Sequence, residues 1–169
     1  MSNFKNIELK HASNIFSMIG KEWMLITAGT EDNYNTMTAS WGTMGELWFK
    51  PVAIIFVRPQ RYTLGFLEKY DCFSLSFFTK EYRNILNYCG TVSGRVADKA
   101  KATGLTPVST DLGNIYFEQA RLVLECRKIY SDSLKPQKII DAATVEKIYP
   151  NGDYHRMFIG EIIGCFAKE

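Results

Sequence analysis

The segment 35–41, Asn-Thr-Met-Thr-Ala-Ser-Trp, constrains the fold more than any other part of the chain. Successive side chains of an extended backbone point to opposite faces, so this segment is predicted to be a strand with one hydroxyl-lined face and one apolar face. Further on, residues 51–57 form an unbroken apolar run, typical of a buried strand, which leads directly into Arg58-Pro-Gln-Arg61-Tyr-Thr63. A hydroxyl-lined strand beside a buried strand that ends in arginine and threonine suits a phosphorylated planar ligand.

The remaining periodicity predicts a mainly β fold with helical insertions. Helices are expected at residues 63–70, from about residue 82 to 89, at 94–103 after a Ser93 N-cap, and at 137–143 after Pro136. Turns join most of the strands, which favours an antiparallel barrel over alternating βαβ units. No linker or repeat divides the chain, so residues 1–169 are predicted to form a single domain. The six expected strands are 23–29, 36–42, 51–58, 72–78, 115–130 and 154–166.

Composition excludes several classes of protein. The formal net charge of +2 gives no support for nucleic-acid binding, which usually requires a basic patch or stripe. The four cysteines are far apart and form no CxxC pair, so neither a zinc site nor a disulfide framework is expected. The first residues lack the apolar core of a signal peptide, and no apolar run approaches the length of a membrane span. We expect a soluble cytoplasmic protein with reduced thiols and no membrane partner.

The turn after the buried strand is a candidate anion site. Arginine offers a planar donor fork that matches phosphate, and Thr63 is placed to cap the helix that begins there. A helix N-terminus adds unpaired N–H groups and partial positive charge. The alternative is that Arg58 and Arg61 are solvated turn residues and that Thr63 is only a cap.

The segment Cys89-Gly-Thr-Val-Ser-Gly-Arg95 is a second candidate. Gly90 and Gly94 could admit the edge of a ligand, although the punctuation between two helices explains them equally well. Cys89 lies on the apolar face of the expected helix and is interpreted as a buried small residue rather than a redox thiol. Lys99 and Lys101 are interpreted as solvated helix charges.

His155 and Ser76 complete the candidate residues. His155 stands on the last expected strand and is a weak candidate for orienting a ligand, the alternative being an ordinary hydrogen-bonded histidine. Ser76 lies near the end of the strand at 72–78, where it either closes a pocket or belongs to the core.

These pieces together resemble the flavin reductase-like FMN-binding split-barrel family, in particular its flavoredoxin-type branch. The resemblance rests on NTMTASW at 35–41, the turn at 58–63, CGTVSGR at 89–95 and His155 followed by Phe158-Ile-Gly-Glu161. One departure is that many reductases of the family have serine before the turn arginine, where this chain has Val57. The resemblance implies a six-stranded antiparallel split barrel that binds FMN and forms a homodimer.

The resemblance also implies a function and a set of contacts. The expected activity is reduction of FMN by NADH or NADPH, with electron transfer to a flavin or to a redox protein partner. The alternatives are a non-enzymatic FMN electron carrier and a relative that binds a planar ligand without redox turnover. Since the cofactors carry the hydride chemistry, no catalytic residue is assigned beyond the weak candidate His155. The implied flavin contacts are Asn35, Thr36, Met37, Thr38, Ala39, Ser40, Trp41, Arg58, Arg61, Thr63, Ser76, Cys89, Gly90, Ser93, Gly94 and His155.

Overall fold

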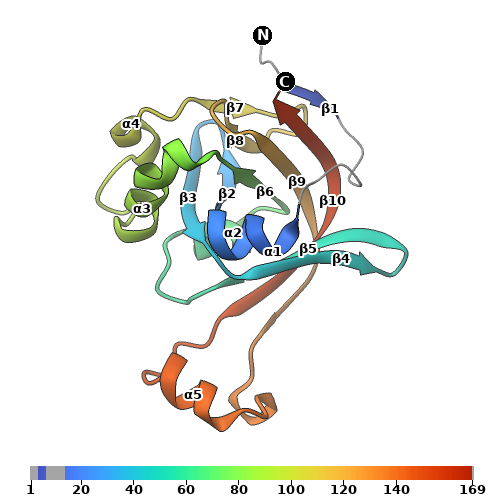
Figure 1. The fold of residues 1–169 in the computed structure, drawn as a ribbon, viewed down its shortest axis with the longest axis vertical. Helices are drawn as coiled ribbons and strands as arrows, with labels where there is room; N and C mark the ends of the chain where they lie inside the picture. The colour runs from blue at the N-terminus through green and yellow to red at the C-terminus, as the bar shows by residue number, and fades with distance from the viewer. Residues whose placement is uncertain (1–3, 7–13, 169) are drawn as a thin grey trace.

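One curled antiparallel sheet forms the body of the molecule (Figure 1). The computed structural model describes residues 4–6 and 14–168, and within them seven strands follow one another in the order β3-β2-β6-β9-β10-β5-β4. No ladder joins β3 to β4 in the described part of the chain, so the barrel is split between these two strands. The strands are β2 (Met24–Thr30), β3 (Asn33–Ala39), β4 (Gly42–Leu47), β5 (Lys50–Val57), β6 (Cys72–Phe77), β9 (Leu122–Ser133) and β10 (Arg156–Lys168), and the short β1 (Phe4–Asn6) also pairs with β10.

Alternating side chains give the sheet two apolar faces. Phe73, Leu75 and Phe77 of β6 point into the barrel, where they join Met24 and Ile26 of β2 in one buried cluster. The opposite face, with Leu25 of β2 and Val123 of β9, packs under Leu86 and Cys89 in a second cluster. Because both faces of the central strands are covered, the barrel has a core inside and a second core under the helices.

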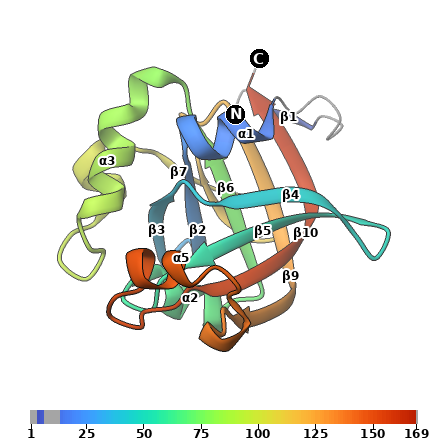
Figure 2. The same cartoon turned by 60° about the horizontal axis from the view of Figure 1, so that its bottom comes forward.

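Helices and a small hairpin pack against the barrel. The 3₁₀ turn η3 (Lys80–Tyr82), α3 (Arg83–Thr91) and α4 (Lys99–Thr103) lie on one side of the sheet (Figures 1 and 2). The hairpin of β7 (Pro107–Ser109) and β8 (Ile115–Phe117) follows them in the chain, and α2 (Thr63–Lys69) connects β5 to β6. The chain enters the barrel through α1 (Ile15–Ser17) and the π-helical turn η2 (Met18–Glu22).

An arm extends from one end of the barrel. It is formed by the outer ends of β9 and β10 together with the 3₁₀ turn η4 (Pro136–Lys138) and α5 (Ala142–Ile148), which lies at the bottom of Figure 1. The sequence predicted a helix at 137–143, but the structure has η4 and then a separate helix. The reason is that the Asp141 side chain accepts hydrogen bonds from the N–H groups of Ala143 and Thr144, which starts α5 there.

The mainly β split barrel with helical insertions is confirmed, and strand is present in all six expected segments. Two details differ. The strand expected at 36–42 ends at Ala39, and Gly42 begins a separate strand, β4. Gly42 packs closely against β5, since a Cβ added to it would lie 2.8 Å from the Ile54 carbonyl oxygen. The helix expected at 94–103 begins only at Lys99, since the Asp98 side chain caps it, and ends at Thr103 as predicted.

The β4–β5 hairpin extends away from the barrel on the side opposite α3 (Figure 2). Leu47 pairs with Lys50, so Trp48 and Phe49 are the two central residues of the turn. Both have positive φ, 54° and 57°, a conformation that bulky residues rarely adopt. Their side chains are 61% and 99% exposed. The hairpin therefore ends in an exposed aromatic tip with an unfavourable backbone.

Candidate functional site

The hydroxyl groups of β3 are hydrogen-bonded inside the protein. The Thr27 Oγ1 hydroxyl donates to Thr36 Oγ1 at 2.9 Å, and Thr36 Oγ1 donates to the Ile26 carbonyl at 3.2 Å. Thr38 Oγ1 donates to the Leu86 carbonyl of α3. The hydroxyl groups of Thr36 and Thr38 thus hold β3 against β2 and α3, and their donor hydrogens are already used inside the protein.

Alternate residues of the same segment point into the barrel. Met37 and Ala39 belong to the inner core, and Met37 also reaches a pocket described below. Ser40 and Trp41 form the link to β4 and line an apolar groove of about 350 Å³ beside Phe16. The predicted contacts 35–41 are therefore spread along a strand whose two ends meet different cavities.

Asn35, Thr63 and Gly94 form a tight junction between β3, α2 and the loop after α3. Asn35 Nδ2 donates to Thr63 Oγ1 at 2.7 Å, and both side chains are buried. A Cβ added to Gly94 would lie 1.9 Å from Asn35 Oδ1 and 3.0 Å from Tyr62 Cδ1, so a glycine is required there. The predicted N-cap role of Thr63 is wrong, because Tyr62 occupies that position and the Thr63 hydroxyl is bound to Asn35.

Two cationic side chains, those of Lys99 and Arg61, lie beside this junction, and neither is paired with a carboxylate among the described residues. Lys99 is 6% exposed, and its Nζ donates to the carbonyls of Thr36 at 2.7 Å and Cys89 at 2.8 Å. Arg61 Nη1 donates to the Gly90 carbonyl at 2.5 Å. Neither forms an ion pair within the described ranges, and burial, together with the charge of Arg61, lowers the pKa of Lys99. Charge buried without a partner is costly, which indicates a site for an anion.

Lys99 corrects the sequence analysis, which interpreted it as solvated. The lysine stands one residue after the N-cap of a short helix, where solvated charges are common. Its burial depends on the Thr36 carbonyl, which is 63 residues away in sequence. Its exposed neighbour Lys101 is the kind of residue that the sequence suggested for both.

A pocket of about 160 Å³ opens at these two cations. Hydroxyl groups from both sides surround it: Thr63 from α2, and Thr91 and Ser93 from the end of α3 and the loop that follows. The Ser93 hydroxyl accepts from the Arg95 N–H at 3.2 Å and does not cap the predicted helix. The structure therefore brings together Met37, Arg61, Thr63, Ser93 and Gly94 from the predicted residues, and adds Lys99.

Arg58 lies in a different environment. It forms an ion pair with Asp153, and its Nη2 donates to the Ile148 carbonyl at 2.9 Å. Its guanidinium also lies 5.4 Å from the centre of the Tyr149 ring. Gln60 Nε2 donates to the same Asp153 carboxylate at 2.9 Å, and these two bonds lower the pKa of Asp153. Arg58 thus attaches the arm to the barrel, and its predicted phosphate contact stays a prediction.

His155 lies at the base of the arm. Its Nδ1 lies 2.8 Å from the Tyr149 hydroxyl, and its ring centre lies 5.3 Å from that of Trp41. Burial and the nearby charge of Arg58 lower its pKa to about 4, so the ring is neutral at pH 7. Its place beside Trp41 is compatible with orienting a ligand, and its hydrogen bond with Tyr149 is equally a structural contact.

The surroundings of Ser76, Cys89 and Gly90 are those of residues that pack within the fold. Ser76 is fully buried in β6 between Leu25 and Val123, on the face under α3, and lines none of the five pockets described for the chain. Burial raises the pKa of the Cys89 thiol to about 11, in agreement with an inert residue. An added Cβ on Gly90 would lie 3.3 Å from Thr38, so this glycine allows α3 to pack on β3.

Comparison with known proteins places the chain among flavin-binding folds. A model of the flavin reductase-like domain family matches residues 16–169. Flavoredoxin from Methanosarcina acetivorans is 22% identical, with a TM-score of 0.69 over 98% of this chain and 76% of that chain. The FMN-binding protein of Thermus thermophilus with bound p-hydroxybenzaldehyde is 21% identical, with a TM-score of 0.71 over 98% and 82%.

A third similar structure is a complex with nucleotide fragments. The Streptomyces globisporus NADH:FAD oxidoreductase SgcE6, with NAD and FAD fragments, is 19% identical, with a TM-score of 0.64 over 86% of this chain and 74% of that chain. A search of curated protein sequences finds no match. None of the described helices has the length and apolar composition needed to cross a bilayer, and no group of three metal-ligating residues occurs in the described ranges.

Proposed function

Because the chain belongs to the flavin reductase-like domain family, we propose that it binds FMN and acts as an NAD(P)H-dependent oxidoreductase. The observation that carries this proposal is the pair of cations, Arg61 and Lys99, which face a hydroxyl-lined pocket with no carboxylate partner among the described residues. When bound, FMN would take up a hydride from the nicotinamide and a proton from water, and pass both electrons to a flavin or protein acceptor.

In this proposal the chain holds the two ends of the flavin differently. Arg61 and Lys99 neutralise the phosphate, with hydroxyl donors from Thr63 and Ser93. Hydrogen bonds to a charged group are stronger than neutral ones, so this end would supply much of the affinity. The backbone of 35–41 would lie along the ring. Since hydride transfer needs mainly positioning, no proton donor is assigned.

The first test is to titrate the purified chain with FMN and then add NADH or NADPH without oxygen. Saturable binding followed by bleaching of the flavin absorbance near the ordinary rate of an enzyme, about 1 s⁻¹ or faster, is the expected result. A bound flavin that dithionite reduces and neither nucleotide reduces would replace the reductase with the electron carrier. A chain that does not retain FMN would refute the proposal as a whole.

The working unit in this proposal is a homodimer. Trp48 and Phe49 form an exposed aromatic tip whose positive φ angles cost free energy, and burial against a partner would offset that cost. The groove of about 350 Å³ beside Phe16 and Trp41 has an apolar lining, which suits the aromatic tip of a second copy.

A double substitution separates folding from association. The variant Trp48→Asn/Phe49→Gly places the residues preferred in a two-residue hairpin turn, so the monomer should fold at least as well as the wild type. Light scattering should show the mass falling from twice 19.3 kDa toward 19.3 kDa. A wild-type monomer, or a variant that remains fully dimeric, would contradict the role of the tip.

A further inference from the structure

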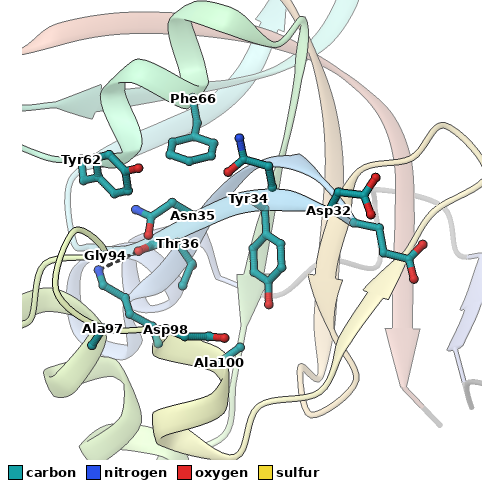
Figure 3. Close-up of a pocket in the computed structure, with 13 residues that line it drawn as sticks. Asp32, Tyr34, Asn35, Thr36, Tyr62, Phe66, Gly94, Ala97, Asp98 and Ala100 are labelled. Atoms are coloured by element: carbon teal, nitrogen blue, oxygen red, sulfur yellow. Dashed lines mark hydrogen bonds between the residues drawn. The ribbon is translucent and has the colours of Figure 1, made fainter.

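A second cavity, of about 360 Å³, borders the cation-lined pocket (Figure 3). The two share Tyr62, Gly94 and Lys99 as lining residues, and the cavity continues past them between β3, α2 and the start of α4. Its volume lies within the range of small-molecule sites. The proposed FMN phosphate would occupy the smaller pocket and leave this cavity open.

Three aromatic side chains contribute to a wall whose other side chains are mostly polar. Figure 3 shows Tyr34 on one side and Tyr62 and Phe66 on another. The Tyr62 and Phe66 rings meet edge to face with centres 5.2 Å apart, and Tyr34 meets Phe117 in the same way at 6.4 Å. These contacts fix the rings in place. A fixed aromatic wall suits a flat, uncharged heterocycle.

Carboxylates lie at the mouth of the cavity. Glu31 and Asp32 form the turn between β2 and β3, both are exposed, and neither has a hydrogen bond or ion pair within the described residues. Asp98 lies opposite. Burial is the main cause of the raised pKa of Tyr34, and the negative charge of Asp98 is the second cause. Lys99 does not neutralise these acids, since its ammonium donates to two backbone carbonyls. The mouth accepts hydrogen bonds and repels anions.

A cation lies beside Tyr62, the aromatic residue that both cavities share, although the cation itself lines a neighbouring pocket. The guanidinium of Arg95, an exposed residue, lies 4.8 Å from the centre of the Tyr62 ring, and its Nη1 donates to the Gln60 carbonyl at 3.4 Å. The side chains are therefore cationic beside the small pocket, aromatic in the cavity, and acidic at its mouth. A molecule with a pyrophosphate, a base and free ribose hydroxyls matches this order.

We propose that this cavity receives the adenosine half of the nicotinamide dinucleotide and that Glu31 and Asp32 make the chain prefer NADH to NADPH. A carboxylate accepts hydrogen bonds from the ribose hydroxyls of NADH, whereas the 2′-phosphate of NADPH would place a dianion beside two carboxylates. This inference rests on the proposed function, because it takes the nicotinamide dinucleotide as the electron donor.

The decisive measurement uses nucleotides that carry no electrons. AMP and adenosine 2′,5′-bisphosphate are titrated into the isotope-labelled, FMN-saturated chain, or the chain alone if FMN does not bind, and backbone amide shifts are followed by NMR. AMP should shift amides at 31–36 and 94–100 and bind at least about fivefold more tightly than the bisphosphate. Asp32→Asn should reduce that ratio by at least about threefold. The matched change Asp111→Asn, in the exposed β7–β8 turn, should leave the ratio unchanged.

The outcomes separate the two proposals. Shifts confined to other surfaces, tighter binding of the bisphosphate, or an equal effect of Asp32→Asn and Asp111→Asn would overturn the adenosine site. In the FMN-loaded enzyme, kcat/KM for NADH should exceed that for NADPH, and the reverse preference would also overturn it. Failure of the chain to retain FMN would refute the proposed function, while the titration would still decide what the cavity binds.

Discussion

The loop junction at Gly94 and the arm at Arg58 use the same kinds of residue in opposite ways. At the arm, Arg58 meets a carboxylate, Asp153, so its charge is neutralised within the protein. At the junction, the hydrogen bonds that Arg61 and Lys99 make within the described residues go to backbone carbonyls. A folded chain tolerates buried charge without a counter-charge poorly, so the contrast supports our proposal that an anion completes the junction, whereas the arm contains its own counter-charge.

The largest expected effect follows from removing the two unpaired cations. Arg61→Ala/Lys99→Met should weaken FMN binding by about 100-fold or more, since each charge-assisted hydrogen bond contributes about 1.5–3 kcal/mol. Fluorescence titration of FMN measures this change. Lys101→Met, which removes an exposed lysine from the same helix, is the matched control and should bind FMN like the wild type. Equal affinity in the double variant would show that the anion site is elsewhere.

The junction should also be the more easily broken of the two regions. Gly94→Ala places a Cβ 1.9 Å from Asn35 Oδ1, so the loop or β3 must shift, and we expect a loss of about 1–3 kcal/mol of stability and weaker FMN binding. Gly65→Ala is the control, because no atom lies within 4 Å of its added Cβ and it stands inside α2. That change should stabilise the chain slightly in urea unfolding. If Gly94→Ala were as stable as Gly65→Ala, the close junction would be disproved.

The sequence predicted the sheet well because its strands are short apolar runs bounded by turn residues, and that signal is local. The sequence predicted the roles of the charged residues in the junction and the arm less well. Arg58 and Arg61 stand three residues apart and look equivalent, and the difference between them is set by Asp153, which is 95 residues from Arg58. Lys99 was missed for the same reason, since no local pattern distinguishes it from Lys101. Long-range partners decide which charges are neutralised, and a single sequence does not reveal them.

Acid should loosen the arm before the junction. His155 has a pKa lowered from 6.5 to about 4, and the charged groups that affect it are Arg58, Asp153 and Arg61. The unfolded chain therefore binds a proton more readily than the folded chain between these values, so stability is fully present above pH 6.5 and falls toward pH 4. The loss should be of the order of 1–3 kcal/mol in urea unfolding across this range. His155→Gln should flatten the slope, and an unchanged slope would assign it to other groups.

The smallest expected effect distinguishes the two arginines directly. Arg58→Ala removes a half-buried ion pair and a bond to the arm, and should cost about 1 kcal/mol of stability with less than a threefold change in FMN affinity. Arg61→Ala should do the reverse, changing stability little and weakening FMN about tenfold or more. Paired measurements of unfolding and FMN binding on both variants test the contrast. A larger loss of FMN affinity in Arg58→Ala than in Arg61→Ala would contradict this contrast. It would mean that Arg58 leaves Asp153 and contacts the phosphate when flavin binds, as the family resemblance implies.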